Sequence, residues 1–271
     1  MQSKSSNYEV AAVRKALEVL CTFSGETPHL TVSELARRLA IPKSTTHNLL
    51  RTLQTLDFVA RDDEKRYRLG PRVFELGHLY SRNTQLVTLA APHLRRLADA
   101  TKETIKLAIL SDDEVLVLVA LESPFQLHTR GDEGKRAPLH CTSLGKALLA
   151  ELPSDEIREI AARRGLARFT ANTITSLSRL EQELERIRAQ GFALDREEHE
   201  EGVRCAAAGF NDAGSHTIAA VSISGPASRI NDARLLEFAR LVAEAARALR
   251  QSLASARHIR TPLEDTVHPE A

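Results

Sequence analysis

The chain has few cysteines, no long apolar run and almost no net charge, and each of these absences narrows its class. The 271 residues include three cysteines, far apart in the sequence, which are too few for a disulfide framework and indicate a reducing compartment. No stretch approaches the roughly 18 consecutive apolar residues of a membrane span. The N-terminal stretch MQSKSSNYEV lacks the apolar core of a signal peptide. The sequence therefore predicts a cytoplasmic protein with no membrane partner.

The net charge of +1 gives no sign of a nucleic-acid partner for the chain as a whole, so charge has to be examined locally. Hydrophobic residues make up 42% of the chain and charged residues 27%, as in an ordinary globular protein with a packed core. The length fits one large domain or two moderate ones.

The first part of the chain has the pattern of three helices. Apolar residues recur at helical spacing over residues 8–23, and Thr31 with Glu34 fits a capping box that opens a second, short helix. Pro42 suits the first turn of a third helix, over residues 43–56. The residues expected on the buried face of this third helix are Leu49, Leu50, Leu53 and Leu56.

Two short strand candidates, residues 58–61 and 66–69, follow the helices and complete the layout of a winged helix-turn-helix. Residues 41–72 contain seven Lys or Arg against four Asp or Glu, a local excess of the sign that DNA requires. A small helical domain with a solvated polar face is the alternative interpretation of the same pattern.

The segments LTVSELARRLAIPKSTTHNLLRTLQTLDFV and YRLGPRVFELG resemble the N-terminal domain of the isocitrate lyase regulator (IclR) family of bacterial transcription factors, over residues 9–70. The family commonly has Arg before the Leu-Leu pair of this helix, where the chain has Asn48, whose amide reads base edges and cannot pair with phosphate as a guanidinium does. The residues expected at the DNA groove are Lys43, Ser44, Thr45, His47, Asn48 and Arg51. Those expected on phosphate, from the wing, are Arg61, Lys65, Arg66 and Arg68.

A linker helix is expected over residues 71–83 and a further amphipathic helix over residues 84–101. A helix-turn-helix domain usually binds DNA as part of a dimer, on a site with two-fold symmetry. The resemblance to the family likewise implies a homodimer or homotetramer. From Thr104 the period changes toward two, which predicts strands over residues 104–111, 114–123 and 125–130. The last helix is expected to run from about Asp232 to Ala254. Residues 1–8 and 256–271 are predicted to be disordered.

The stretch from Gly191 to Ile230 has the composition of a small-molecule site. Asp195 ends a strand-like segment, Cys205 leads an apolar run, and Ser222 and Ser224 alternate with apolar residues, so they share one strand face. A few polar groups on apolar strands are typical of a concave ligand site. A helix that opens at Thr142 or Ser143 adds free N–H groups, which attract an anion. The acidic run from Glu197 to Glu201 is expected on the surface.

The segments APLHCTSLGKALLA and GFALDREEHEEGVRCAAAGFNDAGSHTIAAVSISGP resemble the two signature segments of the IclR effector domain. The resemblance implies a GAF-like α/β domain, over residues 84–255, that encloses a small organic effector, often a carboxylate or an aromatic acid. The effector-contacting positions that it implies are Ser143, Leu144, Asp195, Cys205, Ser222 and Ser224.

Two other classes of function stay open from the residues alone. One is an enzyme with Cys205 as nucleophile, His140 or His199 as base and Asp195 to orient the base. The other is a metal site drawn from those residues and Cys141, which lacks paired spacing such as CxxC. We expect neither, and so no catalytic residue, metal or cofactor. The predicted protein is α+β, with a winged helix-turn-helix domain and a GAF-like domain, and it binds operator DNA in response to an effector.

Overall fold

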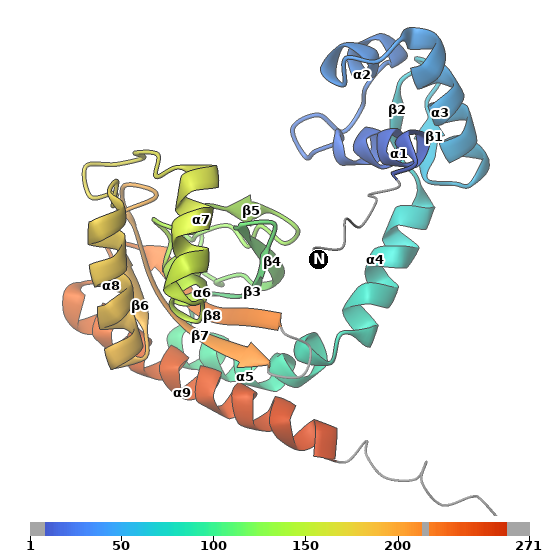
Figure 1. Cartoon of the computed structure of the whole chain (residues 1–271). Helices are drawn as coiled ribbons and strands as arrows, with labels where there is room; N and C mark the ends of the chain where they lie inside the picture. Colours follow the sequence, from blue (N-terminus) through green and yellow to red (C-terminus); the bar gives the residue numbers. More distant parts are fainter. Residues whose placement is uncertain (1–8, 213–216, 259–271) are drawn as a thin grey trace, which may run out of the picture. The chain divides into compact units, whose positions relative to one another are not determined.

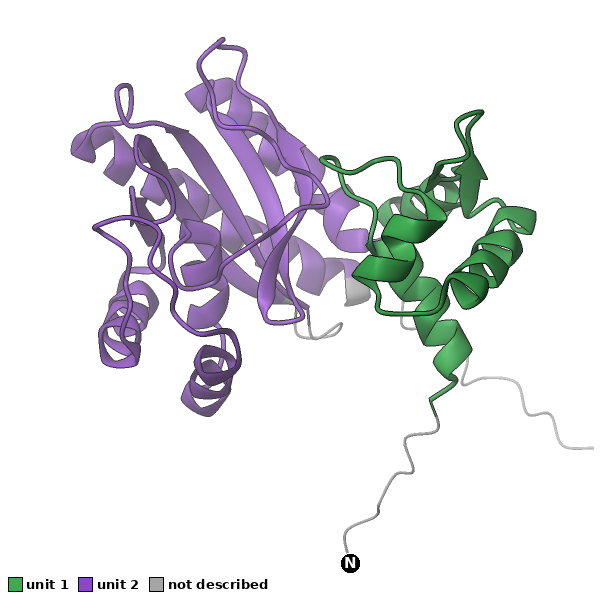
Figure 2. Cartoon of the chain, turned by 90° about the horizontal axis from the view of Figure 1, so that it is seen from above, with its two compact units in different colours: residues 1–83 green, residues 84–271 purple. Residues whose placement is uncertain are grey.

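The structure is a computed structural model that describes residues 9–212 and 217–258, and the chain divides between Asn83 and Thr84 into two compact units (Figure 2). Of the termini predicted to be disordered, residues 1–8 and 259–271 lie outside the described residues, whereas residues 256–258 belong to the last helix, so the prediction is wrong for these three residues. No helix of the described part combines the length and the apolar character needed to cross a bilayer.

The smaller unit consists of helices around a two-stranded hairpin (Figure 1). Its elements are α1 (Ala11–Cys21), α2 (Val32–Arg38), α3 (Lys43–Thr55), β1 (Val59–Arg61), β2 (Tyr67–Leu69) and α4 (Pro71–Asn83). The capping box of α2 is present: the Thr31 hydroxyl accepts from the Glu34 amide at 3.3 Å, and the Glu34 carboxylate accepts from the Thr31 amide at 2.7 Å. The core of the unit is formed by buried residues of α1, α2, α3 and the hairpin, among them Val19, Leu35, Leu50 and Tyr67.

The hairpin forms the wing that the sequence predicts. β1 pairs with β2 in antiparallel register, Val59 opposite Leu69, and Tyr67 also bridges to Leu30 in the segment before α2. The winged helix-turn-helix expectation is confirmed. The expected burial of Leu56 is wrong: α3 ends at Thr55, and the Leu56 side chain, at the end of the helix, is 54% exposed.

The larger unit is a six-stranded antiparallel sheet with helices on both faces. Its strands are β3 (Thr104–Ser111), β4 (Glu114–Leu121), β5 (Arg136–Ala137), β6 (Ala193–Arg196), β7 (Val203–Asp212) and β8 (Thr217–Pro226), in the order β5-β4-β3-β8-β7-β6. Its helices are α5 (Gln85–Thr101), α6 (Ser143–Ala150), α7 (Ser154–Arg164), α8 (Leu177–Gln190) and α9 (Asp232–His258). Figure 1 shows α5 and α9 on one side of the sheet and α6, α7 and α8 on the other.

The two faces of the sheet are packed differently. Toward α5 and α9, large apolar side chains such as Ile105, Val221 and Ile223 form a continuous core. Toward α6 the strands present small residues, including Ala207 and Ala220, so that this helix lies close to the sheet. The expected α+β class and its two-domain fold are confirmed.

Two expected elements differ from the structure. Residues 125–130, predicted as a strand, form a loop, because long-range contacts hold them: the Arg229 guanidinium lies 4.6 Å from the centre of the Phe125 ring, and the Thr129 hydroxyl donates to the Ser224 carbonyl at 3.2 Å. The last helix, predicted to end near Ala254, continues to His258.

Candidate functional site

A cavity of about 650 Å³ lies over the α6-facing side of the sheet, and all six residues predicted to contact an effector line it. They are Ser143, Leu144, Asp195, Cys205, Ser222 and Ser224. The volume falls within the range of about 300–1,000 Å³ that is typical of small-molecule sites. The structure therefore brings together, on one concave surface, residues that lie up to 81 positions apart between Ser143 and Ser224.

The register of the sheet places the polar residues on one face. Asp195 of β6 is paired with Cys205 of β7, which is paired with Ser224 of β8. Side chains of successive strand residues point to opposite faces, so Ala206 and Ile223 lie in the core against α5 and α9 while their neighbours face the cavity.

The start of α6 forms another wall. The Thr142 hydroxyl accepts from the Gly145 amide at 3.0 Å, which caps the helix, and the amides of Ser143 and Leu144 have no intrahelical acceptor. Gly145 is required here, because a Cβ atom would lie 2.3 Å from the Leu139 carbonyl oxygen. The helix start therefore presents N–H groups, with their partial positive charge, beside the cavity that Ser143 and Leu144 line.

Asp195 is a carboxylic acid held inside the protein. It is 3% exposed, and its Oδ1 accepts from the Glu198 amide at 2.8 Å. Burial raises the pKa of Asp195 to about 7, the nearby charge of Glu198 adds to the rise, and the amide hydrogen bond and Lys146 oppose it. At neutral pH this side chain can act both as a hydrogen-bond donor and as an acceptor.

The thiol of Cys205 is protonated at neutral pH. Burial raises its pKa to about 12, with a further contribution from Asp195, while hydrogen bonds with Ser224 and Ser143 oppose the rise. A nucleophilic cysteine requires the thiolate, which this environment disfavours. His140, a proposed base, hydrogen-bonds through Nε2 to the Ala167 carbonyl at 2.9 Å and does not line the cavity.

The metal-site alternative has no matching geometry. In the described ranges 9–212 and 217–258, His, Cys, Asp and Glu side chains form no group of three that could hold a metal ion. Of the five proposed ligands, Asp195, His199 and Cys205 line the cavity, whereas His140 and Cys141 do not.

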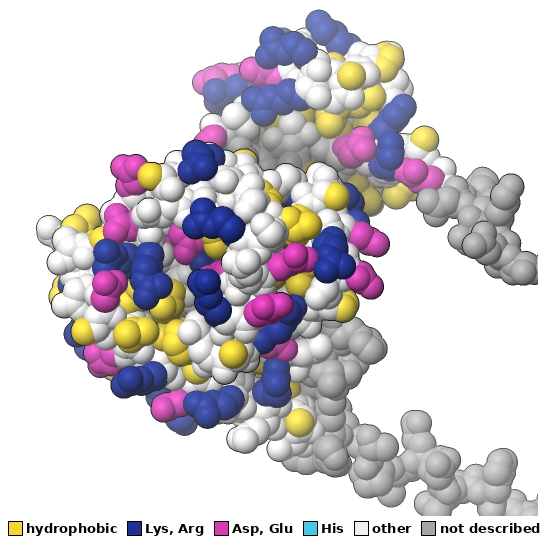
Figure 3. All heavy atoms as spheres, turned by 60° about the vertical axis from the view of Figure 1, so that its left-hand side comes forward, with side chains coloured by type: hydrophobic (Ala, Val, Ile, Leu, Met, Phe, Trp, Pro, Cys, Tyr) yellow, Lys and Arg dark blue, Asp and Glu magenta, His cyan; other side chains and the backbone are white. Residues whose placement is uncertain are grey.

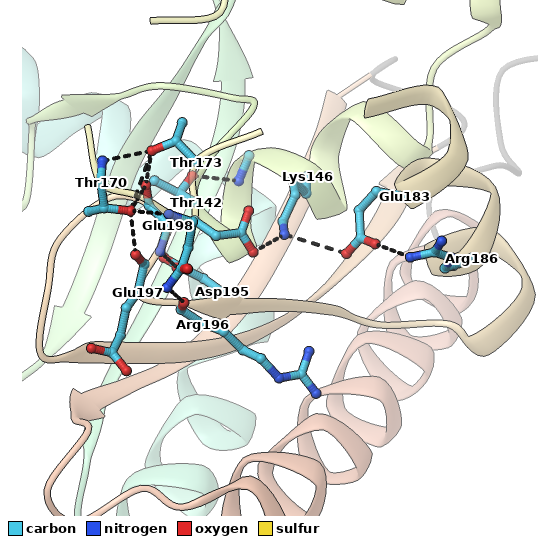
Figure 4. Close-up of polar contacts among 12 residues, drawn as sticks. Thr142, Lys146, Thr170, Thr173, Glu183, Arg186, Asp195, Arg196, Glu197 and Glu198 are labelled. Atoms are coloured by element: carbon cyan, nitrogen blue, oxygen red, sulfur yellow. Dashed lines mark hydrogen bonds and ion pairs between the residues drawn. The ribbon is translucent and has the colours of Figure 1, made fainter. Parts of the chain in front are cut away.

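The acidic run was predicted on the surface, and for Glu198 this is wrong. Glu198 is 8% exposed, and its Oε1 lies 2.5 Å from the ammonium of the fully buried Lys146, which also lies 3.5 Å from Glu183. Figure 4 shows Lys146, from α6, between the carboxylates of Glu198 and Glu183. The Glu198 carbonyl accepts from the Thr173 hydroxyl at 2.7 Å. This network fixes the bend that follows Asp195.

Lys106, which was not predicted as a site residue, lines the cavity from β3. Its register partner on β8 is Ser222. The signal was present in the sequence, since Lys106 is the one charged residue in the strand segment TIKLAILS.

In the smaller unit, the residues expected at the DNA groove all lie on α3, whose buried residues are Thr46, Leu50 and Leu53. Lys43, Ser44, His47, Asn48 and Arg51 are exposed, and Thr45 is half-buried. Basic and acidic side chains are interspersed on the larger unit in Figure 3, so charge alone marks no nucleic-acid surface on that face.

The predicted phosphate contacts of the wing differ in how far their charge is already matched. Arg66 lies 3.0 Å from Asp62 and 2.9 Å from Glu64, so two carboxylates of the wing surround its guanidinium. Arg61 lies 5.5 Å from the centre of the Tyr67 ring and is exposed. Lys65 and Arg68 are also exposed.

Comparisons with known proteins cover both units. Residues 12–63 match the family model of the IclR helix-turn-helix domain, and residues 78–251 match that of the bacterial transcriptional regulator IclR C-terminal domain. The chain belongs to the IclR family. The recognition of this family from the sequence is confirmed, and with it the class of function, a ligand-responsive, DNA-binding transcriptional regulator.

The chain resembles IclR-family relatives over most of its length. It is 34% identical to the transcriptional repressor AllR of Klebsiella pneumoniae over 254 residues, 93% of each chain. It is 36% identical to the transcriptional regulator KdgR of Escherichia coli K12 over 241 residues, 89% of this chain and 91% of KdgR. The crystal structure of an IclR homolog from Microbacterium hydrocarbonoxydans with 4-hydroxybenzoate superposes with a TM-score of 0.80 at 25% identity, covering 90% of this chain and 100% of that one.

Proposed function

We propose that this IclR-family regulator binds an operator as a homodimer or homotetramer and changes its operator affinity when a small organic acid occupies the cavity of the larger unit. The observation that carries the proposal is the cavity itself, which gathers two serine hydroxyls, a buried carboxylic acid and a helix start around apolar walls. An IclR homolog that binds 4-hydroxybenzoate supports an acid as effector.

The proposed DNA contacts follow from exposure and chemistry. The polar face of α3 would enter the major groove, where Ser44, His47 and Asn48 offer hydrogen-bonding groups to base edges. Lys43 and Arg51 would lie at its borders with Thr45. The exposed wing residues Arg61, Lys65 and Arg68 would meet phosphate, and Arg66 would contribute less because its charge is matched within the wing.

The effector would act only through a difference in its affinity for the operator-bound and the operator-free arrangements of the protein. The cavity residues would bind it without chemistry: Cys205, as a protonated thiol, would be a wall contact and not a nucleophile. We therefore propose no enzymatic activity.

The test uses the double variant Asp195→Asn/Ser224→Ala and a matched control, Ser154→Ala/Asp155→Asn, which makes the same changes at exposed positions of α7. An operator is first selected from random duplexes with the wild-type protein. Small acids are then screened for a rise in melting temperature and for release of that duplex. We expect the cavity variant to bind the duplex normally and to lose the acid response, while the control keeps both. An acid response that survives in the cavity variant would contradict the proposed site.

A further inference from the structure

Lys106 lies on the floor of the cavity, in an interior strand of the sheet. Its neighbours in β3, Ile105 and Leu107, are completely buried in the core against α5 and α9. The alternation of side chains along the strand therefore directs Lys106 to the opposite face, where it lines the cavity with its side chain 15% exposed. A largely buried ammonium requires a partner of opposite charge.

The partner that the protein supplies is shared and distant. Lys106 Nζ lies 3.7 Å from Asp132 Oδ2, beyond hydrogen-bonding distance, whereas Lys135 Nζ lies 2.7 Å from the other oxygen of the same carboxylate. The ammonium has three donors, and among the described residues no acceptor is hydrogen-bonded to it. The two glutamates on the cavity lining, Glu200 and Glu201, are exposed to solvent.

A second donor, beside Lys106, also has no hydrogen-bond acceptor among the described residues. Ser222 is the direct register partner of Lys106 on β8, so the two side chains leave the sheet next to each other on the same face. The Ser222 hydroxyl is completely buried, lines the cavity and makes no hydrogen bond to any residue in the described part of the chain. A buried hydroxyl without a partner is unfavourable, and it is satisfied when a ligand oxygen accepts from it.

We propose that Lys106 and Ser222 form an acid-recognition pair on the cavity floor, which restricts the effector to molecules that place an ionised carboxylate there. One carboxylate oxygen accepts from the ammonium and the other from the hydroxyl, which gives each of the two groups a hydrogen-bond acceptor. The inference rests on the proposed effector function of this cavity and specifies the chemical class that it admits. A neutral ligand of the same shape leaves the ammonium desolvated, with the shared Asp132 carboxylate as its counter-charge.

A structural role for Lys106 predicts a different outcome. If its role were to hold the loop of Asp132 against the sheet, removal of either partner would have the same effect. If Lys106 binds a carboxylate, Asp132 competes with the ligand for the ammonium. Asp132→Asn then leaves acid binding intact or tightens it, whereas Lys106→Met abolishes it.

The experiment uses the full-length protein and four acids, benzoate, 4-hydroxybenzoate, oxalate and succinate, each beside its neutral amide. Calorimetry and melting temperature report binding to the wild type, Lys106→Met, Lys106→Arg and Asp132→Asn. The matched control is Lys102→Met, since Lys102 also lies 3.7 Å from an aspartate, Asp99, but does not line the cavity. Lys106→Gln is the second neutral variant, in case the methionine variant does not fold.

We expect at least one acid to bind the wild type and its amide to bind at least about tenfold more weakly, since a hydrogen-bonded charge pair is lost. The neutral Lys106 variants should lose a similar factor for the acid, and Lys106→Arg should retain most of the affinity. Lys102→Met should match the wild type.

Three results would overturn the proposal: amides that bind as well as acids, a neutral Lys106 variant with wild-type acid affinity, or Asp132→Asn behaving as Lys106→Met does. Ligands that bind equally to Lys106→Met but fail with Asp195→Asn/Ser224→Ala would overturn the acid-recognition pair and leave the effector cavity standing. If no acid and no amide bound the wild type, both proposals would fail.

Discussion

The buried ion pair between Lys146 and Glu198 allows a quantitative test of how the cavity wall is held. Lys146→Met replaces the ammonium by an apolar group of similar length at a position with no solvent exposure. The change leaves the Glu198 carboxylate, whose side chain is 11% exposed, without the partner that lay 2.5 Å away. Glu183, at 3.5 Å on the other side of the ammonium, is 21% exposed and can turn to solvent.

Removal of one member of a buried pair lowers the free energy of unfolding by about 3–5 kcal/mol, because the other charge stays desolvated. For a unit of this size that corresponds to a fall in melting temperature of roughly 6–20 °C. The double variant Lys146→Met/Glu198→Gln removes both charges and should recover most of the loss. Arg163→Met, which breaks an exposed 2.8 Å pair with Asp113, should have a much smaller effect.

The loss of stability in Lys146→Met should also depend on pH. Burial raises the pKa of Glu198 above its unfolded value of 4.5, and Lys146 opposes this rise, so Lys146→Met raises the pKa further. An acid whose pKa is higher in the folded state contributes stability at low pH, and this contribution is lost as pH rises through the folded-state pKa. The deficit of the variant is therefore largest at neutral pH and shrinks as pH falls toward 4.5.

Calorimetry and circular dichroism are suitable assays, since the chain contains no tryptophan for fluorescence. The transition of the larger unit is compared between pH 5 and pH 8 for the wild type, the single variant, the double variant and the Arg163→Met control. A single variant that melts within about 2 °C of the wild type, or a deficit that is constant with pH, would refute the reasoning.

Three further predictions concern charge and reactivity. Arg68→Ala should weaken binding to any duplex and reduce the slope of log affinity against log salt by about one. Arg66→Ala should change this slope less, because two carboxylates of the wing already match its charge. Fluorescence anisotropy titrations measure both slopes, and equal changes would contradict the matched charge of Arg66. With its pKa raised to about 7, Asp195 takes up a proton on folding, so stability should fall by about 1.4 kcal/mol per pH unit between pH 4 and pH 7 on its account; Asp195→Asn should remove that slope in calorimetric scans. Iodoacetamide at pH 7 should alkylate the exposed Cys21 and spare the buried Cys205 of the folded protein, as peptide mass spectrometry can determine.

Local signals were sufficient for most elements of the fold. The Thr31–Glu34 capping box, with its two reciprocal hydrogen bonds, involves only residues three apart. The alternation in FQLHTR over residues 125–130 was misleading, because the Ser123 hydroxyl donates to the Lys102 carbonyl at 2.6 Å and Arg229 stacks on Phe125. Such contacts join residues far apart in the sequence, and they override a local strand pattern.

The candidate site was predictable where alternation along one strand applies. Ser222 and Ser224 could be assigned to one face from their spacing, but the register that aligns Cys205 with Ser224 follows only from the folded sheet. Glu198 was misplaced because its partner Lys146 lies 52 residues earlier. A charged residue inside an apolar run was the available signal, both for Lys146 in SLGKALLA and for Lys106 in TIKLAILS.

The separation of the two sheet faces has a consequence for the evolution of ligand choice. Because cavity residues such as Lys106, Cys205 and Ser224 alternate with core residues such as Ile105 and Ile223, single substitutions can alter the chemistry of the cavity and leave the packing against α5 and α9 untouched. An insertion or deletion of one residue within a strand exchanges the two faces of that strand, which would turn Ala206 toward the cavity in β7 or Ile223 toward it in β8. A new ligand preference can therefore arise by point mutation at every second position of these strands, but not by a change in strand length.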